Sequence, residues 1–408
     1  NLFEPNGQFG TRLQGGKDSA SERYIFTKLN KITRFIFPEI DDKILKYLDD
    51  DGFPVEPVFY APIVPMLLIN GSKGIGTGFS TDIMPYHPKE IIMYIKQKLQ
   101  GKNTLDSFIP YFEGFRGTVT KMESSKYLIK GLYETIAKDT IRVTELPVGV
   151  WTDDYKQFLE SLMEGASRGE RKTKKVAIIK EYTDMSTDKR VDITIKLMRG
   201  KLSELEDTET VIGEDILYNE LEKTLRLITT NTTTNMHVFT HEEKLKKYNK
   251  ITDIIDDFFE HRMHLYCERK KAMIRYVTKE LKLITNKAKF INENVNGTIV
   301  LIRKKKSEIV ELLKSKEYDV IDGDETYGYL TKMPMDSMIQ ENVERLNNEQ
   351  GSKQTELTLI EKTSESKMWL SDITKLEAEY TKYIERRYIE TSKKTPKKLK
   401  AKKLKVKK

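Results

Sequence analysis

Arg23 and Tyr24 are adjacent in the sequence, and two further cations, Arg12 and Lys17, precede them in a glycine-rich segment. A guanidinium stays charged at neutral pH and can donate paired hydrogen bonds to an anion. A phenol, whose pKa is about 10, becomes a nucleophile only with help from a base or a metal-bound hydroxide. Most neighbouring arginine and tyrosine side chains only pack, so catalysis and packing both remain open for this pair.

The residues that follow the pair predict a helix. Apolar side chains recur at steps of four, three and four residues, namely Ile25, Leu29, Ile32 and Ile36. Ser19 or Ser21 can cap this helix, which would end before Pro38. Arg23 and Tyr24 would then lie in its first turn, where free N–H groups and the helix dipole favour an anion.

Two glycine-rich segments do not fit nucleotide sites. GGKD at 15–18 lacks the five-residue lead and the serine or threonine of a P-loop. GIGTG at 74–78 has no surrounding βαβ unit and no acid placed to hold a ribose. A tight turn, or a backbone close to a phosphate chain, remains as the explanation for these glycines.

No metal site is predicted. Asp322 and Asp324 form an acidic pair and 49–51 an acidic run, but neither has a third ligand at a recognisable spacing, so both are interpreted as solvated loop acids. The histidines are scattered, and the two on a predicted helix are interpreted as a surface pair; they are His87, His237, His241, His261 and His264. No serine triad, cysteine protease or zincin pattern is present.

Composition limits the class of protein. A chain of 408 residues with 33% charged and 38% hydrophobic residues should form two or more globular units. The single cysteine, Cys267, excludes an intrachain disulfide and indicates a reducing intracellular compartment. The longest apolar run, 59–69, is too short for a bilayer and contains two prolines, so no transmembrane segment is expected. The chain begins with Asn1 rather than Met, which we interpret as a fragment.

The net charge of +8 is mostly a property of the end of the chain. Residues 393–408 contain ten lysines and no acid, so the rest of the chain carries −2. Such a tail is disordered by composition and can bind phosphate or direct nuclear import, or it can be a solvated tail without a dedicated partner. Overall charge therefore does not decide the function.

The elements divide the chain into three parts. Residues 1–100 read as a compact α/β domain, and short β-branched runs at 118–120, 140–144, 174–179 and 191–197 indicate a mixed α+β domain. In the last third, heptad spacing predicts a helix from about 242 to 291, about 75 Å long, and a second long helical stretch at 339–383. An antiparallel intrachain coiled coil is expected, with residues 292–337 as an apolar, self-associating tip.

Five segments carry a family pattern, in this order: GQFGTRLQGGKDSASERYIFT (7–27), DDDGFPVEPVFYAPIVPMLLINGSKGIGTGFS (49–80), ELPVGVWTDDYK (145–156), LKKYNKITDIIDDFFEHR (245–262) and YGYLTKMPMDSM (327–338). In them the chain resembles the DNA breakage and reunion region of eukaryotic-type type IIA DNA topoisomerases, and a large DNA virus is a plausible source. Two positions depart from the pattern. Gln14 stands where histidine is usual and Glu22 where proline is usual.

The resemblance implies roles for six residues. Tyr24 is the nucleophile that forms a 5′-phosphotyrosyl bond, and Arg23 stabilises the developing phosphorane charge. Ile75 inserts between base pairs and bends the DNA, although a buried loop residue is the alternative. The remaining implied DNA contacts are Lys17, Arg12 and Trp151.

The resemblance also implies an α+β multidomain fold. Its parts are the C-terminal portion of a winged-helix domain (1–100), a tower domain (101–240), coiled-coil helix 1 (241–291), a dimer gate (292–337), coiled-coil helix 2 (338–392) and a basic tail (393–408). Mg²⁺ and ATP would bind outside this chain, in TOPRIM and ATPase domains of the full-length enzyme. The expected partners are double-stranded DNA and a second copy bound through the coiled-coil tip, with no membrane.

The activity implied is that of an ATP-dependent type II topoisomerase, which acts at DNA in the nucleus or at a cytoplasmic viral replication site. Alone, the chain should bind DNA and dimerise but cleave poorly or not at all without the metal-binding part of the enzyme. The alternative is a non-enzymatic DNA-bridging coiled-coil scaffold. A nuclease that uses Asp322 and Asp324 is a third reading, and it predicts free 5′ ends.

Overall fold

The computed structural model describes residues 1–104, 107–123, 125–163, 177–212, 216–301, 304–334 and 340–393. The lysine-rich tail lies outside these residues except for its first position. The chain divides into two compact units. Unit 1 comprises Asn1–Phe37, Pro62–Phe259 and Ile373–Lys408, and unit 2 comprises Pro38–Ala61 and Glu260–Asp372. Within the described ranges, no helix is both long enough and apolar enough to cross a membrane.

The segment around Tyr24 is not the long helix that the apolar spacing predicts. It holds one 3-10 turn, η1 (Glu22–Tyr24), and a four-residue helix, α1 (Thr33–Ile36). Between them the backbone is extended, because Leu29 pairs with Phe3 in an antiparallel bridge and neighbouring N–H groups donate across it. The predicted helix is therefore wrong, since these bonds use the backbone groups that a helix needs.

A layer of two helices and one hairpin follows in unit 1. Its elements are α2 (Met66–Asn70), β3 (Ser72–Gly76), β4 (Phe79–Ile83) and α3 (Pro88–Leu99). Helix α3 begins at a proline, whose missing N–H costs nothing in a first turn, and the ring nitrogen Nδ1 of His87 accepts the N–H of Lys89 at 3.1 Å. Side chains on α2 and α3 form a buried core, including Leu68, Ile91, Ile92 and Ile95.

The middle of unit 1 is built from short strands and helices. They are β5 (Thr118–Glu123), β6 (Lys126–Lys130), β7 (Leu132–Ala137), β8 (Thr140–Glu145), α4 (Thr152–Met163), β9 (Ile179–Asp184), β10 (Ile193–Leu197), α5 (Lys201–Glu206), β11 (Glu209–Ile212), β12 (Ile216–Asn219), α6 (Glu220–Thr224), β13 (Ile228–Thr232), β14 (Met236–Phe239) and β15 (Leu245–Tyr248). The predicted strands at 118–120, 140–144 and 191–197 are confirmed, whereas residues 174–176 of the predicted strand at 174–179 lie outside the described residues and β9 begins only at Ile179.

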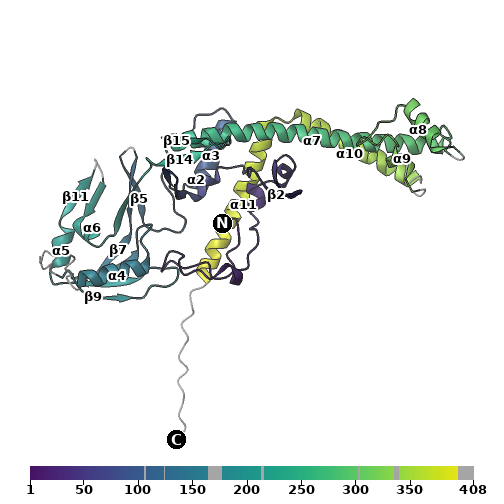
Figure 1. Cartoon of the computed structure of the whole chain (residues 1–408). Helices are drawn as coiled ribbons and strands as arrows, with labels where there is room; N and C mark the ends of the chain where they lie inside the picture. The colour runs from purple at the N-terminus through teal and green to yellow at the C-terminus, as the bar shows by residue number, and fades with distance from the viewer. Residues whose placement is uncertain are drawn as a thin grey trace, which may run out of the picture. The chain divides into compact units, whose positions relative to one another are not determined.

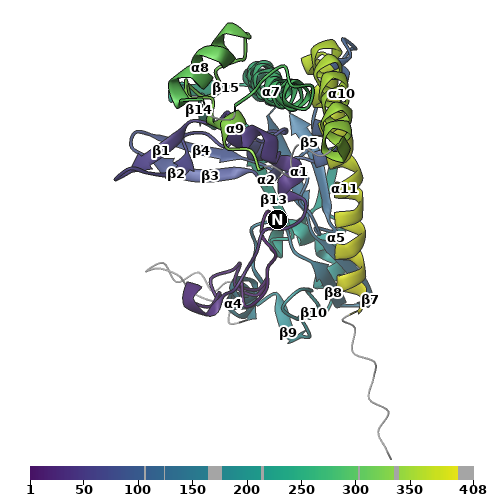
Figure 2. The ribbon, with the colours of Figure 1, turned by 90° about the vertical axis from the view of Figure 1, so that its right-hand side faces the viewer.

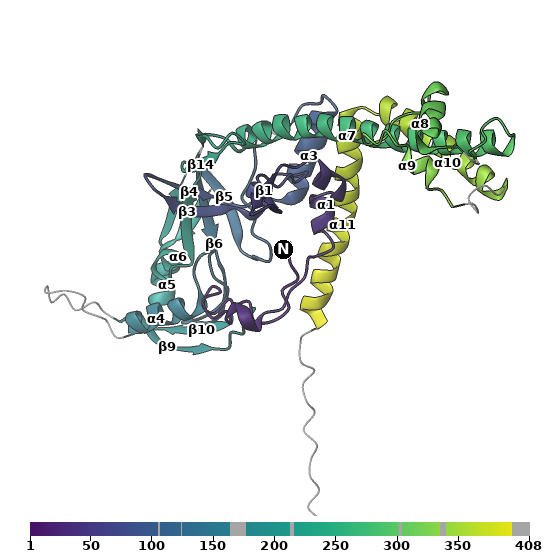
Figure 3. The ribbon, with the colours of Figure 1, turned by 45° about the vertical axis from the view of Figure 1, so that its right-hand side comes forward.

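One antiparallel sheet of this region, with strand order β7-β8-β10-β9, carries a core on one face. Alternate residues of β8 and β10 are buried, as expected for strands with one covered face. Helix α4 contributes Tyr155 and Leu159 to the same cluster and lies beside β9 (Figures 2 and 3). We call β7–β10 together with α4 the sheet layer. A separate three-stranded sheet has the order β13-β6-β5.

Unit 2 contains a long helix and a second helix that runs back along it (Figure 1). Helix α7 (Ile251–Val295) begins nine residues after the predicted start near 242, because β14 and β15 form a hairpin there. The second stretch consists of α10 (Gln340–Lys362) and α11 (Glu365–Lys393), with a break between them. The start of α7, up to Phe259, and the part of α11 from Ile373 on are assigned to unit 1. Successive contacts pair descending positions on α7 with ascending ones on its partners, so the helices are antiparallel: Ala288 with Leu346, Glu280 with Lys353 at 2.8 Å, and Tyr266 with Trp369 at 5.4 Å between ring centroids.

The far end of α7 packs on a small helical cluster. It includes α8 (Lys306–Ser315) and α9 (Gly328–Thr331), around buried side chains of which Phe290, Leu313 and Tyr327 are three. Asp324 accepts hydrogen bonds from the N–H groups of Thr326 and Gly328 at 3.0 and 2.8 Å. The carboxylate therefore holds a loop in place rather than facing a free metal position.

A buried group of charges joins the remaining part of unit 2 to α7. This part holds the 3-10 turn η2 (Glu39–Lys43) and the hairpin of β1 (Tyr47–Asp50) and β2 (Phe53–Pro57). Asp41 on η2 accepts from Arg262 at 2.6 Å and from Arg269 at 2.5 and 2.6 Å. All three side chains are almost fully buried. Because an isolated buried charge is very unfavourable, this network depends on all its members.

Candidate active site

The segment before Tyr24 folds into a loop closed by one carboxylate. Asp18 accepts hydrogen bonds from the N–H and the hydroxyl of Thr11 at 2.8 and 2.5 Å. These bonds, the hydroxyl bond foremost, lower the pKa of the Asp18 carboxyl, so it stays ionised at neutral pH. Gly10 has no room for a side chain, since a Cβ there would lie 2.4 Å from the Cα of Gly16. We call residues 10–18 the GGKD loop.

The GGKD loop is anchored on the sheet layer through Glu145, the last residue of β8. The Glu145 side chain is fully buried and forms an ion pair with the Arg12 guanidinium. It also accepts the N–H of Leu146 at 3.1 Å and the N–H and Nε of Arg116 at 3.3 and 3.4 Å. A buried carboxylate with several donors holds its partners firmly.

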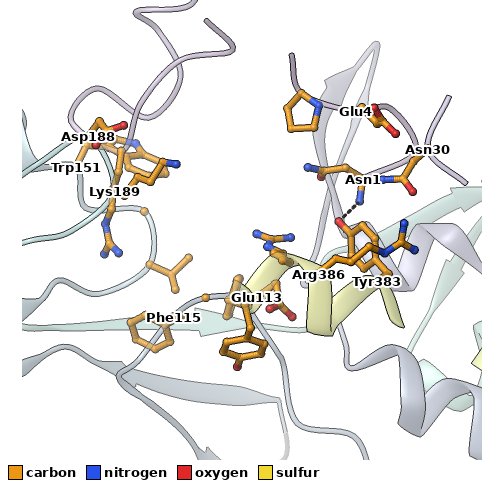
Figure 4. A pocket seen from close by; sticks show the side chains of 18 of the residues that line it. Asn1, Glu4, Asn30, Glu113, Phe115, Trp151, Asp188, Lys189, Tyr383 and Arg386 are labelled. Atoms are coloured by element: carbon orange, nitrogen blue, oxygen red, sulfur yellow. Dashed lines mark hydrogen bonds between the residues drawn. The ribbon is translucent and has the colours of Figure 1, made fainter. Parts of the chain in front are cut away.

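Trp151 forms a second anchor beside the first. A Cβ added to Gly15 would lie 2.3 Å from the indole, so the backbone of the loop lies directly against this ring. The N–H of Asp153 donates to the carbonyl of Leu13, and the N–H of Arg12 donates to that of Asp188, both at 3.0 Å. Trp151, Asp188 and Lys189 line one side of an open cavity of about 1130 Å³, with Asn1 and Tyr383 on the other (Figure 4).

Tyr24 is presented to solvent at the end of η1. Its side chain is 68% exposed, and the Arg23 guanidinium carbon lies 5.6 Å from its ring centroid. Because η1 has only three residues, the expected helix N-terminus for an anion is absent here. Anion binding beside Tyr24 must therefore come from side chains, of which Arg23 is the nearest cation by sequence.

Ile75 lies on the exposed hairpin of β3 and β4. It pairs with Ser80 and is 92% exposed, so the alternative of a buried loop residue is wrong. The hairpin is held by Asn235, the residue before β14. Its amide donates to the Ser80 hydroxyl at 2.8 Å, and its carbonyl accepts the N–H of Asp82 at 2.8 Å. A rigid base therefore presents an apolar tip.

The predicted site residues form three groups in unit 1. Arg12 and Lys17 both lie on the GGKD loop, where Arg12 binds Glu145 and Lys17 is exposed, and Trp151 lies against Gly15 of the same loop. Arg23 and Tyr24 are neighbours on η1, and Ile75 stands on its own hairpin. Sequence reasoning gave no role to Asp18 or Glu145. Both are in family segments, but their partners are known only from the fold.

The described residues contain no group of three or more His, Cys, Asp or Glu side chains that could hold a metal ion.

Comparison with known proteins identifies the family. The family model that describes the A subunit of DNA gyrase/topoisomerase IV matches residues 1–377. The chain is 37% identical over 409 residues to DNA topoisomerase 2 of Plasmodium falciparum and 35% identical over 430 residues to that of Acanthamoeba polyphaga mimivirus. These matches cover 92% and 91% of this chain but only 28% and 33% of the relatives, so the chain spans about a third of their length or less.

A solved structure agrees with the sequence comparison. It is the Plasmodium falciparum topoisomerase II DNA-binding, cleavage and re-ligation domain, with a TM-score of 0.81 and 36% identity. The match covers 97% of this chain and 54% of that one. The chain therefore belongs to the family of the DNA gyrase/topoisomerase IV A subunit, whose members similar to this chain include eukaryotic-type DNA topoisomerases 2 of both cellular and viral origin.

Proposed function

We propose that this chain is the DNA breakage and reunion part of an ATP-dependent type II DNA topoisomerase. The observation that carries the proposal is an exposed tyrosine with an adjacent guanidinium, on a segment whose preceding loop is fixed to the fold. An exposed phenol can reach a DNA phosphate, and a fixed loop limits the positions it can adopt. The family membership supports the same assignment.

In the proposed reaction the Tyr24 oxygen attacks a DNA phosphorus. A tyrosyl–phosphorus bond forms and the bond to the 3′ oxygen breaks, so the products are a 5′-phosphotyrosine and a 3′ hydroxyl. The phenol gives up its proton to a base and the leaving oxygen gains one. Arg23 stabilises the negative charge on the phosphoryl oxygens. One phosphodiester replaces another, so the break can be resealed without an external energy source.

The larger assembly belongs to the same proposal. Residues 1–100 would be the end of a winged-helix domain, 101–240 a tower domain, and the antiparallel helices a coiled coil whose tip binds a second copy. Mg²⁺ and ATP would be held by other parts of the full-length enzyme. The partner is double-stranded DNA inside the cell, in the nucleus or at a viral replication site. Passage of a second duplex through the break relaxes or decatenates DNA.

A trapping experiment tests the proposal. A complete enzyme, with TOPRIM and ATPase regions joined to this chain, is incubated with end-labelled DNA and Mg²⁺ and stopped with detergent. The expected result is labelled DNA that stays covalently attached to the protein through the 5′ phosphate at the break. A DNA-bridging scaffold would give no covalent label, and a nuclease would give free 5′ ends.

Arg23→Ala should slow formation of the covalent complex by about 10²- to 10³-fold, as removal of one charge-stabilising donor does in other enzymes. Arg23→Lys should fall between, because it keeps the charge but loses the planar pair of donors. Single-turnover cleavage measures both. Lys28→Ala is the control, since Lys28 is an exposed cation nearby with an ion pair of 3.4 Å to Glu4. Equal losses at Arg23 and Lys28 would contradict a specific role for Arg23.

Ile75→Ala should reduce the fraction of bound DNA that is bent at least about tenfold, because the apolar side chain that inserts between base pairs is lost. Energy transfer between dyes at the two DNA ends measures the bend. Ile136→Ala is the matched control, since Ile136 is also an exposed isoleucine in unit 1, on β7. The wedge role is contradicted if bending is unchanged in Ile75→Ala. The same holds if both variants lose it equally.

A further inference from the structure

The GGKD loop is attached to the sheet layer at four points, although the two segments are far apart in the sequence. Glu145 binds Arg12, Trp151 covers Gly15, and two backbone hydrogen bonds of 3.0 Å join the loop to Asp153 and Asp188. The loop ends six residues before Tyr24, and Asp18 closes it on Thr11. These contacts therefore fix the position from which the chain continues to Tyr24.

Loss of one partner from this anchor would leave a buried charge without its counterion, which is strongly unfavourable. Glu145 is fully buried, and its oxygens have the Arg12 guanidinium as their closest donor. The remaining donors are the backbone N–H groups of Arg116 and Leu146 and the Arg116 side chain, at 3.1 to 3.4 Å. Arg12 is thereby occupied by protein, with only 24% of its side chain exposed. Because Arg12 is paired in this way, a structural role in the anchor explains it better than a contact with a DNA phosphate.

We propose that Glu145 and Trp151 are positioning residues for DNA cleavage, acting through the GGKD loop to hold Tyr24 where it can attack. The proposal rests on the proposed function, because it concerns the same tyrosine. It also assigns Arg12 to the loop anchor rather than to DNA. A small displacement of a nucleophile lowers the cleavage rate with little effect on DNA binding.

Glu145→Gln in the complete enzyme provides the first test. It removes the charge that Arg12 pairs with and keeps the size of the side chain. The single-turnover cleavage rate should fall at least about tenfold, while the Kd for DNA changes less than about twofold. A direct Arg12–DNA contact predicts the reverse pattern, because an Arg12 released from Glu145 would strengthen DNA binding and leave cleavage intact.

Substitutions at two neighbouring glycines test the contact between Trp151 and the GGKD loop. Gly15 and Gly16 have backbone φ angles of +64° and +86°, so alanine is strained at both. Only Gly15 lies against the indole, whereas a Cβ on Gly16 meets nothing within 4 Å. Gly15→Ala should therefore lower the cleavage rate about tenfold or more, and Gly16→Ala should lower it much less. Melting temperatures of both variants show whether either loss of cleavage comes from unfolding, since the backbone strain is common to the two.

The outcomes separate the two proposals. If the wild type forms covalent complex and both Glu145→Gln and Gly15→Ala cleave at the wild-type rate, the positioning role is overturned and the proposed function stands. Loss of DNA binding in parallel with cleavage, or equal loss at Gly15 and Gly16, also overturns it. A wild type that forms no covalent complex overturns both.

Discussion

Tyr24→Phe should abolish the covalent attachment of DNA to the protein in a complete enzyme, while the Kd for DNA stays within about twofold of the wild type. The substitution removes one oxygen atom, and that oxygen is the proposed nucleophile. Its effect on folding should be small, because the side chain is 68% exposed and its ring remains. Detergent trapping with end-labelled DNA measures attachment, and a filter-binding titration measures Kd.

Tyr388→Phe is the matched control for this variant, since the Tyr388 side chain is 67% exposed in the same unit. Attachment should persist in it. Label that survives in Tyr24→Phe would mean that another side chain is the nucleophile. A parallel loss of DNA binding would mean that Tyr24 contributes to affinity rather than to chemistry.

The strands β8 and β10 could be predicted from the sequence, and the local structure around Tyr24 could not. Their β-branched runs are a local signal, so they can be recognised without knowing the fold. The spacing of Ile25, Leu29, Ile32 and Ile36 is helical, yet the bridge between Phe3 and Leu29 holds that backbone extended. A cross-strand partner some 26 positions away is not part of any helical pattern.

In the candidate site, too, contacts between residues far apart in the sequence could not be predicted. Tyr24, Arg23 and Ile75 were identified from family segments, and the structure adds that Tyr24 and Ile75 are exposed. Glu145 lies in one of those segments, but its importance depends on Arg12, which is 133 positions away. The prediction of Arg12 as a DNA contact likewise lacked this partner. Burial of a carboxylate is a property of the fold, and no spacing in the sequence reveals it.

Asp41→Asn should lower the free energy of unfolding of the part that contains it by about 3–5 kcal/mol, because it leaves Arg262 and Arg269 buried without their shared anion. The loss is large since both guanidiniums are almost fully buried and lie over the Tyr266 ring at 4.4 and 4.2 Å. Urea titration followed by tryptophan fluorescence is a suitable measurement, because Trp369 stacks on Tyr266 and reports on this region.

Asp322→Asn is the matched control in the same unit. Asp322 also pairs with a cation, Lys279, but its side chain is 70% exposed, so the expected loss is at most about 1 kcal/mol. The contrast tests whether burial, rather than the number of ion pairs, determines the stability of this unit. Equal losses at Asp41 and Asp322 would contradict it. A larger loss at Asp41 would mean that buried ion pairs hold the segment with η2 and the β1–β2 hairpin on α7. In Asp41→Asn only one carboxylate oxygen is replaced by an amide nitrogen, so the loss would come from the charge and not from the size of the side chain.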